Sequence, residues 1–162
     1  MMEKKVFSRI ACLGLELTAE EWGEWIKQHS SSEVVFHHGD FGFNSHDVCL
    51  TPHSVMVYDA GGYRRWTIKV AQSPNGRWTE GSTTGWGSSP CMFCSDPTKG
   101  YATEREAIYA GLMRMEESAR RDLAWYDRRH ETGDQRINES KKVLAQIAVL
   151  KERYDPRQLT LF

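Results

Sequence analysis

Apolar residues recur at helical spacing in three stretches of the chain. They predict helices from Ala19 to about His29, from Thr103 to about His130 and from about Asn138 to Tyr154. At the start of each of the first two helices, a threonine is followed three residues later by a glutamate. This pattern is a capping box, which satisfies free backbone amides at a helix start. Because only the short break Glu131–Asp134 separates the last two helices, they are expected to form an antiparallel hairpin.

The stretch between the first two helices alternates with a period of two, which is typical of strands. Strands are predicted around residues 55–57 and at residues 65–72 and 77–83. The glycine-containing turns Asp59–Gly62 and Ser73–Gly76 connect them, so an antiparallel meander is expected. Since Trp66, Ile68 and Val70 share one face of the middle strand, we expect one buried face, packed against the second helix.

Two regions beside the meander have weaker patterns. Residues 33–36 predict a short strand, and residues 39–46 predict a turn and a short strand. Residues 85–100 are rich in Gly, Ser and Pro and predict a long irregular loop.

Together these elements predict the α+β class. We expect a small antiparallel β-meander packed against a long helix, with an N-terminal helix and a C-terminal αα-hairpin. The predicted divisions are an α+β domain over residues 1–130, a C-terminal helix over 131–155 and a tail over 156–162. The C-terminal helix either packs on the domain or projects from it, and packing is favoured because most amphipathic helices bury their apolar face.

Length and charge narrow the class of protein. The chain has 162 residues, which suits one domain, and its formal charge is −1, from 21 Lys and Arg against 22 Asp and Glu. This balance disfavours a strongly basic nucleic-acid binder and an acidic DNA mimic. No apolar run approaches the ~18–20 residues of a membrane span, and the N-terminus breaks into charge too soon for a signal peptide. We therefore expect a cytoplasmic protein without disulfides.

The cysteine pattern allows a metal site. His46 and Cys49 form an H-x-x-C pair, and Cys91 and Cys94 form a C-x-x-C pair. Two such pairs supply the four ligands of a tetrahedral zinc ion, so zinc is a candidate cofactor and no other is expected. In the alternative interpretation, Cys49 and Cys91 are small buried hydrophobes and Cys94 is exposed.

Basic residues gather on the long predicted helix, with Trp125 and Tyr126 between them. They are Arg114, Arg120, Arg121, Arg128 and Arg129. One interpretation is a face that contacts DNA phosphates. The other is a solvated helix laced with ion pairs, which the interleaved Glu116, Glu117, Asp122 and Asp127 favour.

The sequence ends with Gln158-Leu159-Thr160-Leu161-Phe162, one residue after the helix stop Asp155-Pro156. This Gln-Leu-x-Leu-Phe sequence resembles the short motif with which bacterial polymerases and repair and replication-initiation factors dock on the β sliding clamp. All four specified positions match, and Thr160 occupies the tolerant one. The resemblance implies that Gln158 enters a polar subsite, that Leu161 and Phe162 fill a hydrophobic one, and that Leu159 supports them.

This resemblance implies a non-enzymatic accessory or regulatory protein of bacterial, phage or plasmid origin whose partner is the β sliding clamp. A second hypothesis is a small zinc-supported module that binds protein or nucleic acid and buries its own tail. A third is an enzyme with a site in the 85–100 loop. The sequence has no P-loop, dinucleotide-binding glycine motif, H-E-x-x-H or G-x-S-x-G, so no enzymatic chemistry is predicted.

Overall fold

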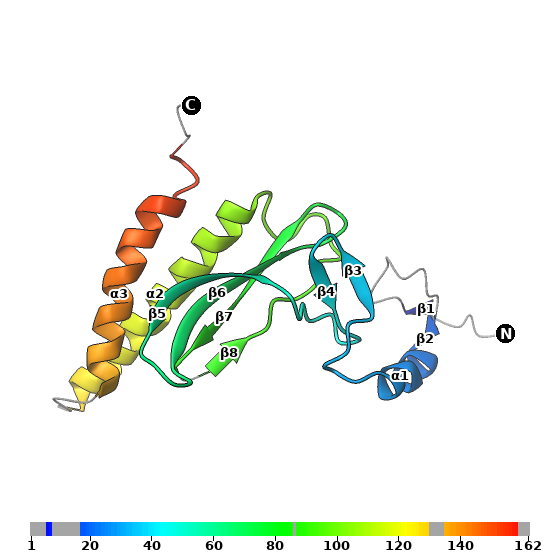
Figure 1. Ribbon diagram of the computed structural model, residues 1–162, viewed down its shortest axis with the longest axis horizontal. Coiled ribbons are helices and arrows are strands. Elements are labelled where there is room, and N and C mark those ends of the chain that lie inside the picture. The colour runs from blue at the N-terminus through cyan, green and yellow to red at the C-terminus, as the bar shows by residue number, and fades with distance from the viewer. Residues whose placement is uncertain (1–5, 8–16, 86, 130–134, 159–162) are drawn as a thin grey trace.

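The protein has the predicted α+β fold. The computed structural model describes residues 6–7, 17–85, 87–129 and 135–158 (Figure 1). Its helices are α1 (Ala19–Gln28), α2 (Glu104–Arg128) and α3 (Gln135–Tyr154). Its strands are β1 (Val6–Phe7), β2 (Leu17–Thr18), β3 (Phe36–His38), β4 (Phe41–Phe43), β5 (His53–Asp59), β6 (Arg65–Gln72), β7 (Trp78–Thr84) and β8 (Gly87–Ser89).

The main sheet is an antiparallel meander in the order β5-β6-β7-β8. Strands β5, β6 and β7 lie where the alternation predicts them. The fourth strand corrects the prediction of an irregular loop over residues 85–100, because Ser82, Thr83 and Thr84 of β7 pair with Ser89, Ser88 and Gly87. The pairs β1–β2 and β3–β4 form two further antiparallel ribbons.

Both predicted capping boxes are present. The Thr18 hydroxyl accepts from the Glu21 amide, and the Glu21 carboxylate accepts from the Thr18 amide. Thr103 and Glu106 make the same reciprocal pair at the start of α2. Each box satisfies amides that a helix start leaves without intrahelical partners, so the local sequence determines where these helices begin.

The principal core lies between the sheet and α2. Trp66, Ile68 and Val70 of β6 are buried against Ile108, Leu112 and Met115 of α2. Gly111 lets α2 approach closely, since a Cβ at this position would lie 2.8 Å from the Ile68 side chain. The predicted contact between the middle strand and the long helix is therefore confirmed.

Helix α3 completes this core. Val143 and Ile147 are fully buried in the same cluster, and α3 lies beside α2 and β5 (Figure 1). An ion pair reinforces the packing, because Arg64, in the turn between β5 and β6, lies 2.7 Å from the buried carboxylate of Glu139 on α3. The apolar face of α3 is thus used for folding.

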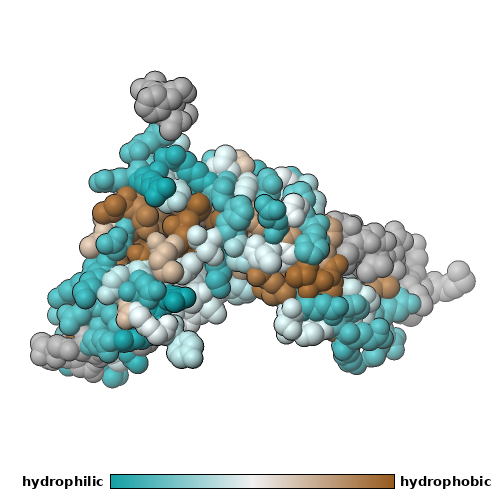
Figure 2. Space-filling view, viewed as in Figure 1, coloured by the Kyte–Doolittle hydropathy of each residue, from teal (hydrophilic) through white to brown (hydrophobic). Residues whose placement is uncertain are grey.

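A second cluster covers the other face of the sheet at one end. Phe41, Phe43, Cys49 and Cys91 are buried there with Ala71, which faces away from α2. The prediction of a single buried face is therefore wrong for β6, where Ala71 and Thr67 are also buried. Figure 2 shows two hydrophobic areas on one side of the molecule, one over α2 and α3 and the other near β3 and β4.

Among the described helices, none combines the length and the apolar character that crossing a membrane requires.

Candidate partner-binding site

The predicted partner-binding segment begins where α3 ends. Tyr154, the last residue of α3, packs partly buried against the principal core. Pro156 disfavours helical geometry for the residue before it, so the helix stops ahead of Asp155. The stop predicted at Asp155-Pro156 is confirmed.

The end of α3 is held by Arg105 in the first turn of α2. The Arg105 Nη2 atom donates to the Arg153 carbonyl at 2.7 Å, and its Nε atom donates to the Asp155 carbonyl at 3.1 Å. The last carbonyls of a helix have no intrahelical partner, and this guanidinium satisfies two carbonyls at the helix end. The last turn is therefore completed by a side chain of the body of the protein.

A local turn follows the helix. The Asp155 carboxylate accepts hydrogen bonds from the backbone and the guanidinium of Arg157, at 2.8–3.0 Å. These bonds favour the charged carboxylate and lower the pKa of Asp155 to about 2. The Gln158 amide donates to the Asp155 carbonyl at 3.1 Å, which closes the turn.

Gln158 is the first residue of the motif and the last that the structure describes. It is exposed, as are Pro156 and Arg157, and this segment leads away from the end of α3 (Figure 1). Leu159, Leu161 and Phe162, the predicted apolar contacts, lie outside the described residues. The structure therefore places the turn that precedes the motif and Gln158, the first of the four specified residues.

A cavity of about 350 Å³ lies beside the end of α3 that leads into this turn. Its lining includes His53 of β5, Glu104 and Ile108 of α2, and Tyr154 of α3. His53 Nδ1 lies 2.9 Å from a carboxylate oxygen of Glu104 across the cavity wall. A C-terminal segment that folded back onto its own protein would have this cavity adjacent to it, which is the alternative to binding a partner.

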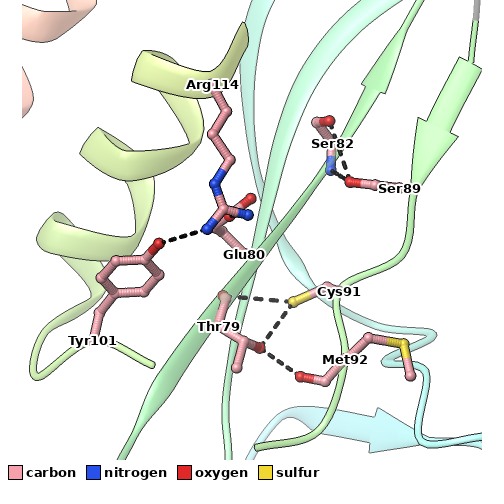
Figure 3. Close-up of polar contacts among 8 residues, drawn as sticks. All are labelled: Thr79, Glu80, Ser82, Ser89, Cys91, Met92, Tyr101 and Arg114. Carbon is pink, nitrogen blue, oxygen red and sulfur yellow. Dashed lines mark hydrogen bonds and ion pairs between the residues drawn. The ribbon is translucent and has the colours of Figure 1, made fainter. Parts of the chain in front are cut away.

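The predicted zinc ligands are not gathered into one site. The Cys91 thiol is directed at Thr79 of β7 (Figure 3), while the Cys94 thiol donates to the Asp96 carbonyl at 3.2 Å. His46 is exposed, and its Nδ1 bonds the Ser45 hydroxyl at 3.1 Å. In the part of the chain that is described, no group of three or more His, Cys, Asp or Glu side chains is arranged to hold a metal ion.

Cys49 and Cys91 instead behave as core residues. The Cys49 amide donates to the Cys91 carbonyl at 2.8 Å, and both side chains belong to the second cluster. Burial raises the pKa of the Cys91 thiol to about 11 and also raises that of Cys49. Cys94 is buried as well, which corrects the expectation that it is exposed.

Most of the arginines proposed for DNA contact have partners within the protein. Arg114 pairs with Glu80 of β7 and donates to the Tyr101 hydroxyl at 3.2 Å (Figure 3). Arg120 pairs with Glu116 at 2.7 Å, one turn earlier on α2. Arg128 donates to the Ala124 carbonyl. The guanidinium carbon of Arg129 lies 4.0 Å from the centre of the Trp125 ring. Arg121 is exposed and lies next to Asp122 in the sequence. This pattern is typical of a solvated helix, and DNA contact stays a prediction.

Comparison of the chain with protein-family models, curated proteins and solved structures gives no match.

Proposed function

We propose that the protein is a non-enzymatic accessory or regulatory factor that binds the bacterial β sliding clamp through Gln158–Phe162. The observation that carries the proposal is the complete Gln-Leu-x-Leu-Phe sequence, which only the three residues Asp155–Arg157 separate from the capped end of α3. Binding to a partner would explain why three apolar residues follow a helix stop and an exposed turn.

The packing of α3 supports this proposal. Val143 and Ile147 complete the core, and Arg105 satisfies the carbonyls at the end of the helix. Neither contact uses a residue of the motif, so these contacts hold α3 in place without it. A linear motif needs this separation, because its side chains must be available to a pocket on the partner.

The chemistry of the motif indicates how the binding energy is divided. Burying Leu161 and Phe162 in a pocket would contribute about 1.5–3 kcal/mol each. Gln158 has both an amide donor and an acceptor and would fix the register at the mouth of the pocket, for about 0.5–1.5 kcal/mol. Leu161 and Phe162 are therefore the expected anchors, with Leu159 as a supporting contact.

Binding of this kind has two alternative outcomes. The α+β body would be delivered to replicating DNA, or it would block access to the clamp by other proteins that use the same pocket. The paired arginines of α2 favour indirect delivery over strong DNA binding by the body itself.

The test is calorimetric titration of a peptide of residues 153–162 into a bacterial β clamp. We expect saturable binding that weakens at least tenfold for Leu161→Ala and for Phe162→Ala, since 1.4 kcal/mol is one decade in affinity. Gln158→Ala should weaken binding less.

Thr160→Ala is the matched control, because Thr160 occupies the tolerant position of the motif, and this peptide should bind like the parent. Failure of the parent peptide to bind, or equal effects of Thr160→Ala and Phe162→Ala, would contradict the proposal.

A further inference from the structure

A cavity of about 560 Å³ lies on the face of the main sheet that points away from α2. Lys69 of β6 contributes to its lining from the sheet. The register places Lys69 between Ser54 of β5 and Gly81 of β7, both on the same face. The cavity is therefore distinct from the C-terminal segment, which follows α3 on the opposite side of the sheet.

Gly81 makes one wall of this cavity possible. The backbone of residues 89–91 crosses directly over it, so a Cβ on Gly81 would lie 2.6 Å from the Cys91 nitrogen and 2.7 Å from the Ser89 oxygen. Such distances are too short for any side chain. Glycine at this position lets the segment after β8 lie flat on the sheet beside Lys69.

The segment from Val48 to Pro52 forms the opposite wall. It is held to the first wall by the hydrogen bond from the Cys49 amide to the Cys91 carbonyl, 2.8 Å long, and by a bridge between Val48 and Met92. Because hydrogen-bonded backbone forms both walls, the cavity is built into the fold and does not depend on a movable loop.

The charge inside the cavity is unbalanced. Lys69 is the one charged residue among the described residues that line it, and it has no ion-pair or hydrogen-bond partner within the described chain. Its side chain is half-buried, while the hydroxyl-bearing Ser54 and Ser88 also line the space. An ammonium group with three donors, in a cavity whose described lining includes no carboxylate, is suited to an anionic oxygen.

Most of the remaining lining is apolar, although Thr51 and Ser89 also contribute to it. Val48, Leu50 and Pro90 line the same space as Lys69. A cavity of this size lies within the usual range for small-molecule sites, which combine apolar walls with a few polar groups that fix orientation. The lining therefore suits a ligand with an anionic head and an apolar body.

We propose that this cavity binds a small organic anion, whose carboxylate or phosphate head pairs with Lys69 and whose apolar part lies against Val48, Leu50 and Pro90. The site is independent of the proposed clamp binding, because it uses none of the C-terminal residues. Partial burial strengthens the pairing, since water screens a half-enclosed charge less than an exposed one.

The test uses two probes that share a phenyl ring and differ in the head group, benzoate and phenyl phosphate. Binding is followed by NMR titration of the full chain, with benzyl alcohol as the neutral analogue. We expect at least one anion to saturate, with shifts at residues 48–54, 69 and 88–91, and benzyl alcohol to bind at least tenfold more weakly. The tighter of the two probes identifies the head group.

Lys69→Met removes the charge and keeps the length of the side chain, and it should weaken anion binding at least tenfold. Lys69→Arg should retain binding. Lys142→Met is the matched control, because Lys142 is an exposed lysine on α3 and does not line the cavity. If Lys69→Met unfolds the chain, Lys69→Gln replaces it. The proposal is overturned if neither anion saturates, or if the Lys69 and Lys142 variants bind alike.

Discussion

The principal core and the turn after α3 are stabilised by different kinds of contact. In the core, side chains from β6, α2 and α3 exclude water together, and Ile68, Leu112 and Ile147 have almost no exposed surface. In the turn, Asp155, Arg157 and Gln158 hydrogen-bond to one another, and Arg105 of α2 donates to the Asp155 carbonyl. Changes in the core should therefore alter stability, whereas changes beyond the turn should alter partner binding alone.

The largest effect on stability is expected in the core. Leu112→Ala should lower the free energy of unfolding by about 2–5 kcal/mol, because the change leaves a cavity beneath the sheet. For a chain of this size, each 1 kcal/mol corresponds to about 2–4 °C in melting temperature. Thermal unfolding followed by circular dichroism measures the change.

The adjacent residue of α2 provides a control for this prediction. Met113 is 44% exposed, so Met113→Ala should change the melting temperature only slightly. Similar losses for Leu112→Ala and Met113→Ala would mean that the core does not lie where the structure places it.

A smaller effect on stability is expected from changing Glu80, which lies on the side of β7 that faces α2. Burial raises the pKa of the Glu80 carboxyl above its ordinary value of 4.5, and the nearby Arg114 only partly opposes this shift. A raised folded-state pKa means that the stabilising contribution is fully present below pH 4.5 and is lost as the pH rises through the folded-state value.

At pH 7 the Glu80→Gln variant should therefore be no less stable than the parent protein. As the pH falls toward 4, the stability of the parent should increase relative to that of the variant. Melting temperatures of both proteins at several pH values test this. A clear loss of stability for Glu80→Gln at pH 7 would show that the ion pair with Arg114 outweighs the cost of burial.

Local sequence patterns predicted the elements that local chemistry determines. Thr18 and Thr103 begin helices because their own neighbours complete the capping boxes. Strand β6 was predicted over its full length because Trp66, Ile68 and Val70 alternate with residues of the other face. Gly87–Ser89 has little strand propensity and is a strand only because β7 offers a partner, so its sequence carries no comparable signal.

Contacts between distant segments could not be predicted in this way. The second cluster brings Phe43, Ala71 and Cys91 together from three parts of the chain, and it converts an expected solvent face into a buried one. Arg105 reaches carbonyls 48 and 50 residues later in the chain, so its role follows from the packing of α2 against α3. The cavity at Lys69 likewise depends on a distant segment, because the backbone of residues 89–91 that forms one wall crosses over Gly81.

The smallest effect on stability is expected beyond the turn, where the effect on binding should be the largest. The most direct test compares the intact chain with its Leu161→Ala, Phe162→Ala double variant, measuring the melting temperature and the affinity for a bacterial β clamp on the same samples. We predict a melting temperature within about 2 °C of the parent, which corresponds to less than ~1 kcal/mol, and an affinity at least a hundredfold weaker, since two buried anchors are lost. A melting temperature that falls as far as that of Leu112→Ala, or clamp binding that persists at full strength, would contradict the division between a folded body and a partner-binding tail.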